Sequence, residues 1–426
     1  MDRDTAFEMA TSAIRYGSGA TAEVGMDMQD MGLHRVLVVT DSSLAQLDPV
    51  AIVRDSLDRA GVEHELFDRV RVEPTDESFK DAIGVASAGG FDGYVAVGGG
   101  SSIDTSKAAN LYASHPPENF LDYVNAPIGK GLPAPGPLKP LVAVPTTAGT
   151  GSETTGVAIF DLAEMRAKTG IAHRRLKPTL GIVDPDNTRS LPPEVAASTG
   201  LDVLSHALES FTALPFDHRS RPKRPLLRPS YQGANPISDL WALRALELVR
   251  NYLLRAVTDP SDDEARGQML LAATFAGIGF GNAWVHLPHG MSYPVAGMVR
   301  AYQPPGYDVD HAMVPHGIAV IVNAPAVFRF TATANPQRHL QAAEVLGADL
   351  SGVKDQDSGR LLADVIIDFM RRLKVPNGLG ALGYDRSDVP ALVEGTLPQH
   401  RVTKLSPRSA DAEELMAIFE DAFTYW

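Results

Sequence analysis

Apolar and polar residues alternate along the first half of the chain in two different patterns. Short runs rich in Val, Ile and Leu predict buried strands at residues 35–40, 63–67, 94–97, 141–144 and 180–183. Between them, apolar residues recur at helical spacing, which predicts helices at 49–60, 77–88 and from the glycine run at 98–100 to about 113. Because parallel strands are joined by helical crossovers, the alternation predicts an α/β domain with a Rossmann-like parallel sheet.

The pattern changes near Asp184-Pro185 and the stretch Ser190 to Pro193. Beyond this point strand signals fade, and helical spacing predicts long helices at 238–256, 262–278 and 359–373. A Pro-Pro pair favours the start of a helix, so the first of the later helices is expected just after residue 190. We therefore predict an α/β domain at residues 1–190 and an all-helical domain at residues 191–426.

Composition narrows the class of protein. Of the 426 residues, 44% are apolar and 21% are charged, which excludes a mostly disordered chain. The formal net charge of −14 argues against non-specific binding to nucleic acid or to anionic membranes. No apolar run approaches the roughly 18–20 residues that span a bilayer. The first residues are acidic and mixed, so no secretory signal is visible, and we expect a cytoplasmic protein.

The chain contains no cysteine, which excludes disulfides, thiolate metal sites and cysteine nucleophiles together. Any metal site must therefore be built from His, Asp and Glu.

A glycine-rich loop, Gly98 to Asp104, follows a predicted strand and opens a predicted helix. Glycines let the backbone approach a ligand, and the free N–H groups and dipole of a helix start attract a phosphate. The alternative is an ordinary tight turn. The loop lacks the Gly-x-Gly-x-x-Gly spacing, and no Gly-Lys-Ser/Thr follows it, which argues against a P-loop nucleotidase.

A second loop, Pro145 to Glu153, also follows a strand and offers four hydroxyl groups and two glycines. Loops after neighbouring parallel strands line the carboxyl edge of one sheet, where α/β folds bind their ligands. Asp41, directly after another strand, could accept a hydrogen bond from a ribose, or it could be a turn residue. The residues predicted to bind the cofactor are Asp41, Gly98, Gly99, Gly100, Ser101, Ser102, Asp104, Thr146, Thr147, Thr150 and Ser152.

A group of Asp and His residues marks the second domain. Asp202 and His206 are four residues apart, so a helix places both on one face among apolar neighbours. His286, His289 and His316 follow in short motifs with Gly and Pro. A carboxylate and several imidazoles without sulfur suit Fe²⁺ or Zn²⁺. The alternative is a set of buried, hydrogen-bonded side chains, and spacing alone leaves the two interpretations level.

Taken together, five motifs resemble the iron-containing (group III) alcohol dehydrogenases. They are Gly98–Asp104, Pro145–Glu153, Gly200–Glu209, His289–Met291 and Pro315–Gly317, in the order in which that family carries them. The resemblance implies the dehydroquinate synthase-like fold of this family, with a dinucleotide-binding domain followed by a helical metal-binding domain. It also implies that Asp202, His206, His289 and His316 hold the metal, whereas His286 is a packed or hydrogen-bonded residue.

Within this family the chain is most similar to the hydroxyacid–oxoacid transhydrogenases. The segments that carry this likeness are 6–10, 71–76, 107–114, 120–130, 233–239, 277–282 and 396–404. The resemblance implies hydride transfer through NAD between a hydroxy acid and an oxo acid. The implied pair is 4-hydroxybutyrate with 2-oxoglutarate, which gives succinate semialdehyde and 2-hydroxyglutarate. The implied metal is Fe²⁺, with Zn²⁺ as an alternative, and we expect a homo-oligomer, a dimer, that binds neither nucleic acid nor membrane.

Other functions share these motifs. An NAD-dependent alcohol or lactaldehyde dehydrogenase of the same family is the main alternative. A glycerol dehydrogenase or a dehydroquinate synthase shares the fold but uses other pocket residues and usually Zn²⁺. A metal-free assembly protein of the same fold is a third alternative, which the intact Asp and His residues argue against.

Two features depart from the more familiar alcohol dehydrogenases. Many of them carry a further His, thought to assist proton transfer, at the position that is Tyr293 here, and Tyr293 is therefore our candidate catalytic residue. The segment 217–228 resembles an insertion, and it carries five cations between Arg219 and Arg228. These cations are either a solvated basic loop or a clamp for a substrate carboxylate.

Overall fold

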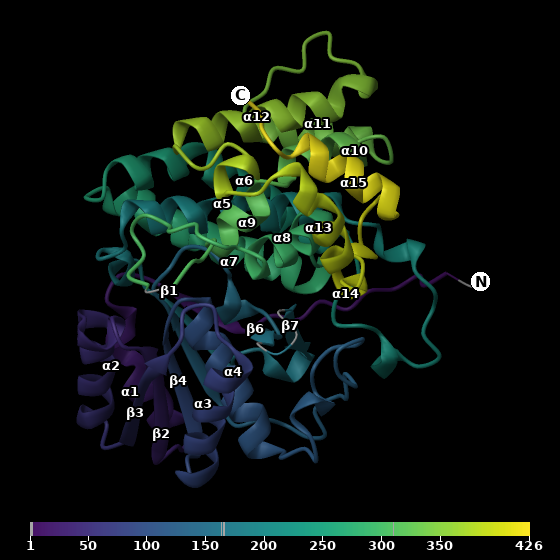
Figure 1. Ribbon diagram of the computed structural model, residues 1–426. Helices are drawn as coiled ribbons and strands as arrows, with labels where there is room; N and C mark the ends of the chain where they lie inside the picture. Colours follow the sequence, from purple (N-terminus) through teal and green to yellow (C-terminus); the bar gives the residue numbers. More distant parts are fainter. Residues whose placement is uncertain (1–2, 163, 165–166, 310) are drawn as a thin grey trace. The chain divides into compact units, whose positions relative to one another are not determined.

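The computed structural model describes residues 3–162, 164, 167–309 and 311–426 (Figure 1). The chain divides into two compact units. The sheet unit is Ala10–Leu191, and the helical unit is Pro192–Trp426 together with Met1–Met9. The predicted α/β fold and the helical region that follows it are confirmed.

A six-stranded parallel sheet forms the centre of the sheet unit, in the order β1-β8-β5-β4-β2-β3. Its strands are β1 (Ala13–Tyr16), β2 (Arg35–Asp41), β3 (Glu63–Val70), β4 (Gly93–Gly98), β5 (Leu141–Pro145) and β8 (Leu180–Val183). Five of these six strands lie where the apolar runs predict them. The carboxyl ends of β2, β4 and β5 lie side by side at one edge of the sheet, because these strands are parallel neighbours.

Alternation along each strand divides the core of this unit between the two faces of the sheet. Val36, Val38 and their counterparts in β4 and β5 pack with helices α1 (Val24–Asp30) and α2 (Asp48–Arg59). Leu37, Val39 and the alternate residues of the same neighbours pack with α3 (Asp76–Ala88) and α4 (Gly100–Ser114), the helices in front of the strands in Figure 1. Burial of each such side chain stabilises the fold by about 1.5–3 kcal/mol. Because helices cover both faces of the sheet, these strands are nearly continuous apolar runs in the sequence.

Three strands lie outside the prediction. Edge strand β1 has no fully buried residue and therefore no apolar run. Strands β6 (Val157–Leu162) and β7 (Ala167–Ala172) pair antiparallel in a separate two-stranded sheet. Strand β7 contains Ala, Lys and Gly, residues that are depleted in strands, so propensity does not reveal it.

The helical unit is built around a buried helix, α5 (Pro193–Thr212), which packs against α6, α7 and α9. Almost all side chains of α5 from Ala196 onward are buried, as expected of a helix at the centre of a bundle. The other helices are α6 (Pro236–Thr258), α7 (Asp263–Ala283), α8 (Leu287–Gly297), α9 (His316–Ile321), α10 (Ala324–Thr331), α11 (Pro336–Val345), α12 (Ser358–Arg372), α13 (Val389–Thr396), α14 (His400–Thr403) and α15 (Ala412–Asp421). Among the described residues no single helix is long and apolar enough to cross a membrane, although the pair α7 and α8, bent by 104°, meets that test jointly.

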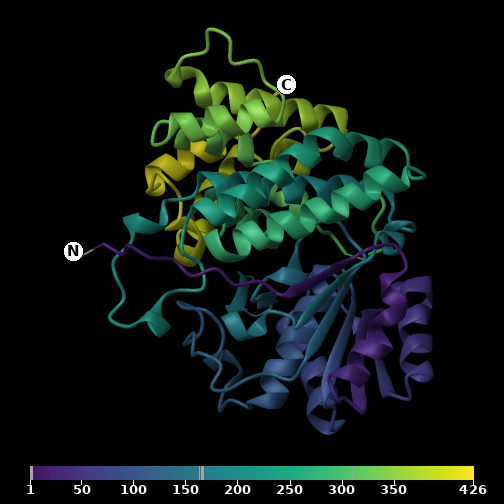
Figure 2. The same cartoon turned by 180° about the vertical axis from the view of Figure 1, so that it is seen from behind.

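The first nine residues, which the sequence assigns to the α/β domain, group with the helical unit. Arg3 pairs with Ser220 in an isolated β-bridge, and the N-terminal segment runs beside the inserted segment (Figure 2). The carboxylate of Asp4 is buried and lies 2.8 Å from Arg219 Nη2 and 3.0 Å from Arg228 Nε. These two cations of the basic stretch therefore pair with the protein's own carboxylate.

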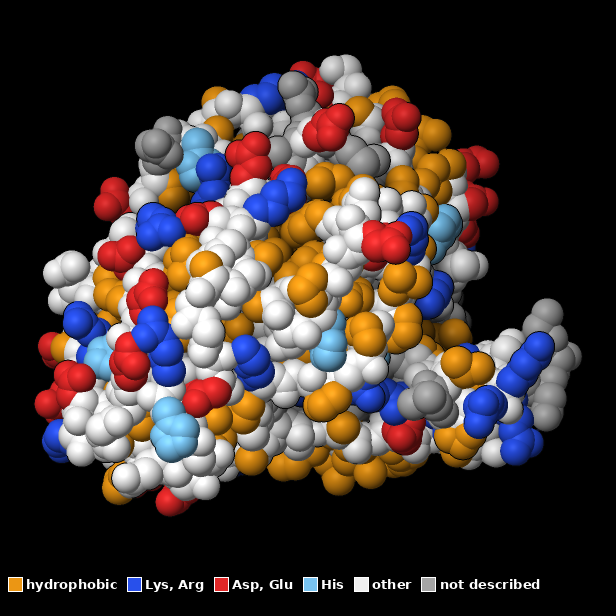
Figure 3. Space-filling view, turned by 90° about the horizontal axis from the view of Figure 1, so that it is seen from below, with side chains coloured by type: hydrophobic (Ala, Val, Ile, Leu, Met, Phe, Trp, Pro, Cys, Tyr) orange, Lys and Arg blue, Asp and Glu red, His pale blue; other side chains and the backbone are white. Residues whose placement is uncertain are grey.

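The other three cations of that stretch, Arg221, Lys223 and Arg224, are exposed. Lys and Arg side chains gather at one edge of the view in Figure 3. Exposure of this kind agrees with the interpretation of the stretch as a solvated basic loop.

Candidate active site

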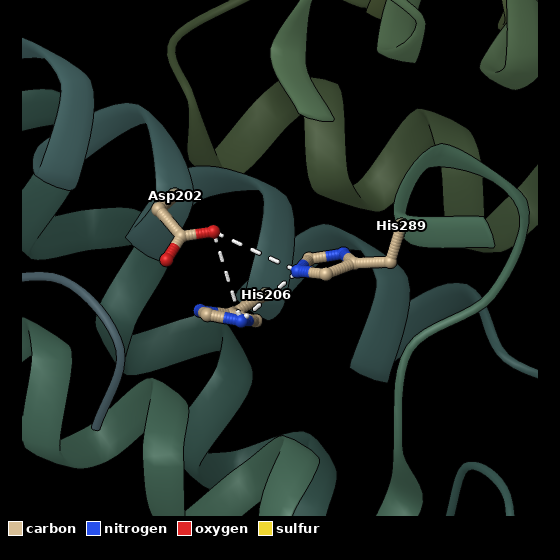
Figure 4. Close-up of side chains that lie close together, drawn as sticks. All are labelled: Asp202, His206 and His289. Atoms are coloured by element: carbon tan, nitrogen blue, oxygen red, sulfur yellow. Dashed lines mark hydrogen bonds and ion pairs between the residues drawn. The ribbon is translucent and has the colours of Figure 1, made fainter. Parts of the chain in front are cut away.

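Helix α5 brings Asp202 and His206 together inside the helical unit. Both side chains are buried, one turn apart on the same face of the helix. Asp202 Oδ1 lies 3.7 Å from His206 Nε2 and 3.6 Å from His289 Nε2 (Figure 4). The same oxygen lies 3.9 Å from His316 Nε2. The four residues implied by the family resemblance therefore meet around one carboxylate oxygen.

Close backbone packing makes this meeting possible. His316 is the first residue of α9, and the next residue is Gly317. A Cβ atom on Gly317 would lie 2.0 Å from Ser198 O and 3.1 Å from Asp202 Cβ. Only glycine therefore lets the start of α9 approach α5 closely enough to place His316 beside Asp202.

A buried carboxylate, Glu209, orients His289. Glu209 Oε1 accepts a hydrogen bond from His289 Nδ1 at 2.5 Å, and Oε2 accepts one from the His286 backbone N–H at 2.6 Å. With Nδ1 held in this way, His289 Nε2 faces His206 Nε2 at 3.1 Å. Such a carboxylate–histidine pair fixes both the ring and its tautomer at metal sites.

An aromatic side chain packs directly on the cluster, whereas His286 points elsewhere. Phe280 stacks on His206 with ring centroids 4.0 Å apart and planes within 7°. His286 does not face the cluster: its Nε2 lies 3.0 Å from Thr212 Oγ1 and its ring is edge-on to Phe328. This placement agrees with the expectation that His286 is a packed, hydrogen-bonded residue.

The donor set fits a divalent ion. Asp202 Oδ1 is buried without a hydrogen-bond partner, and Asp202, His206 and His289 form a compact group of possible ligands. Bonds of about 2.0–2.2 Å to one ion would hold neighbouring ligand atoms roughly 3–4 Å apart. Burial lowers the pKa of His206 to about 3, which keeps this imidazole neutral, as a metal ligand must be. Burial opposes the charged form of His289 as well, but Glu209 and Asp202 raise its pKa to about 10.

The two predicted phosphate loops touch each other at the sheet edge. A Cβ atom on Gly99 would lie 3.1 Å from Thr147 Oγ1, and one on Gly100 would lie 2.6 Å from Thr150 Cγ2. Gly98 has a φ of +147°, and a Cβ there would lie 2.5 Å from Ser102 Oγ. The glycines thus let the hydroxyl-bearing side chains pack directly on the backbone at the start of α4, where Ser101 also lies.

Asp104 and Ser152 connect these loops internally. Ser152 Oγ donates to Asp104 Oδ1 at 2.6 Å, and the fully buried Lys107 donates to Ser152 Oγ at 2.6 Å. Asp104 Oδ2 also accepts the Ile159 backbone N–H at 2.9 Å. The structure therefore gives Asp104 and Ser152 a positioning role, with Lys107 as a third member that sequence reasoning missed.

Asp41 and Thr146 lie at the same edge. Asp41 ends β2, and its Oδ1 accepts the backbone N–H of Leu44 at 2.9 Å, which is the turn role considered from sequence. Thr146 is buried after β5, and its backbone N–H donates to Gly98 O at 3.1 Å. The structure brings all the predicted loop residues to one sheet edge, and their contact with a cofactor stays a prediction.

Comparison with known proteins identifies the family. The model of the iron-containing alcohol dehydrogenases matches residues 11–185, and the C-terminal model of the Fe-containing alcohol dehydrogenase family matches residues 230–423. The chain belongs to the iron-containing alcohol dehydrogenase family. A rat protein named hydroxyacid-oxoacid transhydrogenase, mitochondrial, is 60% identical over 418 residues, which cover 98% of this chain and 90% of the rat protein.

Solved structures of iron-containing alcohol dehydrogenases and their relatives share the fold. A 1,3-propanediol oxidoreductase superposes with a TM-score of 0.85 at 29% identity, covering 98% of this chain and 100% of the other. Sulfoacetaldehyde reductase from Bifidobacterium kashiwanohense, in complex with NAD⁺, gives 0.79 at 27% identity and covers 98% of this chain and 99% of its own.

The comparisons overturn the cytoplasmic location expected from sequence. The rat relative is named as mitochondrial, and so is the human one, which is 58% identical. The expectation was wrong because it used the absence of a visible secretory signal, and that absence does not distinguish a cytoplasmic protein from a mitochondrial one.

In this member of the iron-containing alcohol dehydrogenase family, Tyr293 lies one helical turn after His289 on α8 and is buried. Its hydroxyl accepts a hydrogen bond from Arg401 Nη2 at 2.7 Å. Sequence reasoning did not select Arg401 as a site residue, because a contact across 108 positions leaves no spacing signal.

Proposed function

We propose that this chain is a hydroxyacid–oxoacid transhydrogenase. It would oxidise 4-hydroxybutyrate to succinate semialdehyde and reduce 2-oxoglutarate to 2-hydroxyglutarate, with one hydride passing between the two acids. The observation that carries this proposal is the 60% identity to the rat transhydrogenase across 98% of the chain. The substrate pair is the one that the resemblance implies.

Asp202, His206, His289 and His316 would hold a divalent ion, with Fe²⁺ as the proposed metal and Zn²⁺ as the alternative. The carboxylate oxygen that faces three imidazoles supports this ligand set. A bound ion supplies Lewis acidity, which lowers the pKa of a substrate hydroxyl and stabilises the alkoxide. Glu209 holds His289 in the orientation that the ligand set requires.

The sheet edge would bind NAD(H). The close packing of Gly99 and Gly100 against the hydroxyl-bearing Thr147 and Thr150 at the start of α4 supports a diphosphate there, and the related sulfoacetaldehyde reductase was solved with NAD⁺. When bound, NAD would supply the carrier for the hydride that passes between the two substrates. Asp41 would disfavour NADP(H), because its carboxylate would repel a 2′-phosphate.

Tyr293 would handle the proton of each half-reaction. The oxidation of the hydroxy acid releases one proton and the reduction of the oxo acid consumes one, so a tyrosine hydroxyl can hold and return it without fast exchange with solvent. The position of Tyr293, one turn from His289, supports this role.

The test is an assay of the purified protein with 4-hydroxybutyrate deuterated at the reacting carbon and with 2-oxoglutarate, without added NAD⁺. The expected product is 2-hydroxyglutarate that carries deuterium at C2, formed in equal amount to succinate semialdehyde. Accumulation of free NADH with simple alcohols, and no deuterium in 2-hydroxyglutarate, would instead identify an alcohol or lactaldehyde dehydrogenase. Light scattering on the same sample tests the proposed homodimer.

A further inference from the structure

Arg401, at the start of α14, is a cation surrounded by aromatic rings. Its guanidinium carbon lies 5.4 Å from the ring centroid of Tyr293 and 5.7 Å from that of Trp284. Nη2 donates to the Tyr293 hydroxyl, whereas Nη1 is buried and has no hydrogen-bond partner among the described residues. Trp284 is 3% exposed, and its indole Nε1 is buried without a partner as well. Two buried donors are thus left unsatisfied next to one positive charge.

In the described part of the chain no carboxylate pairs with Arg401. Arg408, another arginine that lies over an aromatic ring, does have such a partner. Arg408 lies over the ring of Phe330 at 3.9 Å, and Glu414 compensates its charge at 2.9 Å. A second cation, Lys404, lies close enough for its pKa to be lowered by Arg401 as well as by burial, with burial the larger cause. Arg401 is half-buried, but a charged nitrogen that is buried without a hydrogen-bond partner or counter-ion is costly, so the surroundings of Arg401 favour an anion that is not part of the protein.

The position of Arg401 links it to the reacting end of the substrate. Gly290 follows His289, and a Cβ atom on Gly290 would lie 2.7 Å from Thr403 Cγ2, so α14 packs directly beside the cluster. Tyr293, the partner of Arg401, is four residues after His289, which is about 6 Å along a helix axis. Arg401 is therefore tied to a point one helical turn from the cluster.

We propose that Arg401 binds the carboxylate at the far end of both acid substrates, with Trp284 Nε1 as a further donor and Tyr293 as the residue that positions the guanidinium. The inference rests on the proposed function. In 4-hydroxybutyrate and in 2-oxoglutarate a carboxylate lies three carbon–carbon bonds from the carbon that reacts. An extended chain of this kind spans roughly 6 Å between its hydroxyl and carboxylate oxygens, from bond lengths near 1.5 Å.

A shared anchor explains how one site serves two half-reactions. The hydroxy acid and the oxo acid present the same distant carboxylate, so a single arginine holds both at the same distance from the reacting carbon. Arginine suits this task because its planar fork binds carboxylates through two parallel hydrogen bonds. A neutral alcohol leaves the buried donors unpaired and is bound less well.

The experiment compares Arg401→Gln and Arg401→Lys with the matched control Arg408→Gln. For each protein, KM and kcat are measured with 4-hydroxybutyrate, with 2-oxoglutarate and with neutral 1,4-butanediol, and the equilibrium Kd of 2-oxoglutarate is measured by calorimetry. We expect Arg401→Gln to raise both acid KM values and the Kd about 100-fold, with the butanediol KM changed less than about 3-fold. Arg401→Lys keeps the charge but not the fork, so an intermediate rise is expected. Arg408→Gln should match the wild type.

Unchanged acid KM values in Arg401→Gln would overturn the inference, and so would an equal loss of acid and diol turnover. If Arg401→Gln does not fold, Arg401→Lys decides. A rise in the KM of the two acids without a rise in the KM of butanediol supports the binding of the carboxylate by Arg401. Acid KM values equal to those of the wild type contradict it. The proposed function fails separately, if the wild type transfers no hydride between the two acids. In that case the Kd of 2-oxoglutarate for Arg401→Gln and for the wild type still tests whether Arg401 binds the carboxylate.

Discussion

His206 contributes one nitrogen to the cluster and stacks on Phe280, so it is the residue through which the metal assignment is best tested. His206→Ala should lose both the bound metal and turnover, since three ligands would remain where four are proposed. The measurement is metal content by elemental analysis beside the transhydrogenase assay. His339→Asn is the control, because His339 is also buried and hydrogen-bonded, to Thr331 and Asn335. Full metal occupancy in His206→Ala would remove this residue from the site.

Tyr293 offers a second test at the scale of one hydroxyl group. Tyr293→Phe should lower kcat several-fold with the metal retained, because only the proton-handling group is lost. Tyr293→His should move the pH dependence toward neutral values and raise the oxidation of simple alcohols. Profiles of kcat against pH for the three proteins provide the measurement. A rise in the acid KM with unchanged kcat would give the hydroxyl a part in positioning Arg401 and none in proton transfer.

The residues of the candidate site differ in how well their roles can be predicted from the sequence. Asp202 and His206 share a helix, and their spacing alone places them on one face. His289 and His316 come from other helices, and only the family resemblance connects them to the pair. Glu209 and Arg401 were not selected, because neither a buried Glu nor a half-buried Arg has a local pattern, and the partner of each is found only when the helices have packed.

Among the elements, the carboxyl end of β2 carries the next prediction. Asp41→Gly should improve the use of NADP⁺ relative to NAD⁺, since the like-charge repulsion with a 2′-phosphate disappears. Asp41→Asn is the matched variant, because its amide oxygen can still accept the Leu44 N–H that Asp41 now accepts. The ratio of kcat/KM for the two cofactors should rise in both variants. An unchanged ratio in both would place Asp41 away from the ribose.

At the scale of elements, prediction succeeds where burial dictates the pattern. Strands β2, β4 and β5 are covered on both faces, so they read as apolar runs. Strand β1 lies at the sheet edge and shows no such run, and β7 contains residues that strands disfavour. Their pairing comes from partners far away in the sequence, Leu180–Val183 for β1 and Val157–Leu162 for β7.

For the molecule as a whole, Asp4 ties the N-terminal segment to the inserted segment. Asp4→Asn should make trypsin cut faster after Arg219 and Lys223, because the guanidinium groups of Arg219 and Arg228 lose the buried carboxylate that holds the segment between them. The measurement is the rate of cleavage at these two sites, and Glu413→Gln, an exposed carboxylate elsewhere, is the control. Equal rates in Asp4→Asn and wild type would mean that Asp4 does not restrain this segment.

The same contact sets a pH dependence. The hydrogen bond from Arg228 holds the pKa of Asp4 below its usual value. A carboxylate whose pKa is depressed by folding stabilises the folded state above its unfolded pKa of about 3.9, and this contribution is lost as the pH falls through the folded value. Protection from proteolysis should therefore be complete at neutral pH and disappear only in acid below about pH 4, as an acid-stable protease can report.

The pairing of β1 with β8 has a consequence for how the protein is made. The ribosome releases Ala13–Tyr16 first, yet this strand has no place in the sheet until Leu180–Val183 has emerged and paired with β5. At a synthesis rate of roughly 5–20 residues per second the wait is on the order of ten to thirty seconds. Until then the edge of β5 stays open to strands of other nascent chains. Met1–Met9 wait longer still, until the segment with Ser220 and Arg228 has been synthesised. The strand order thus leaves an unpaired edge during translation, the kind of surface that chaperones protect.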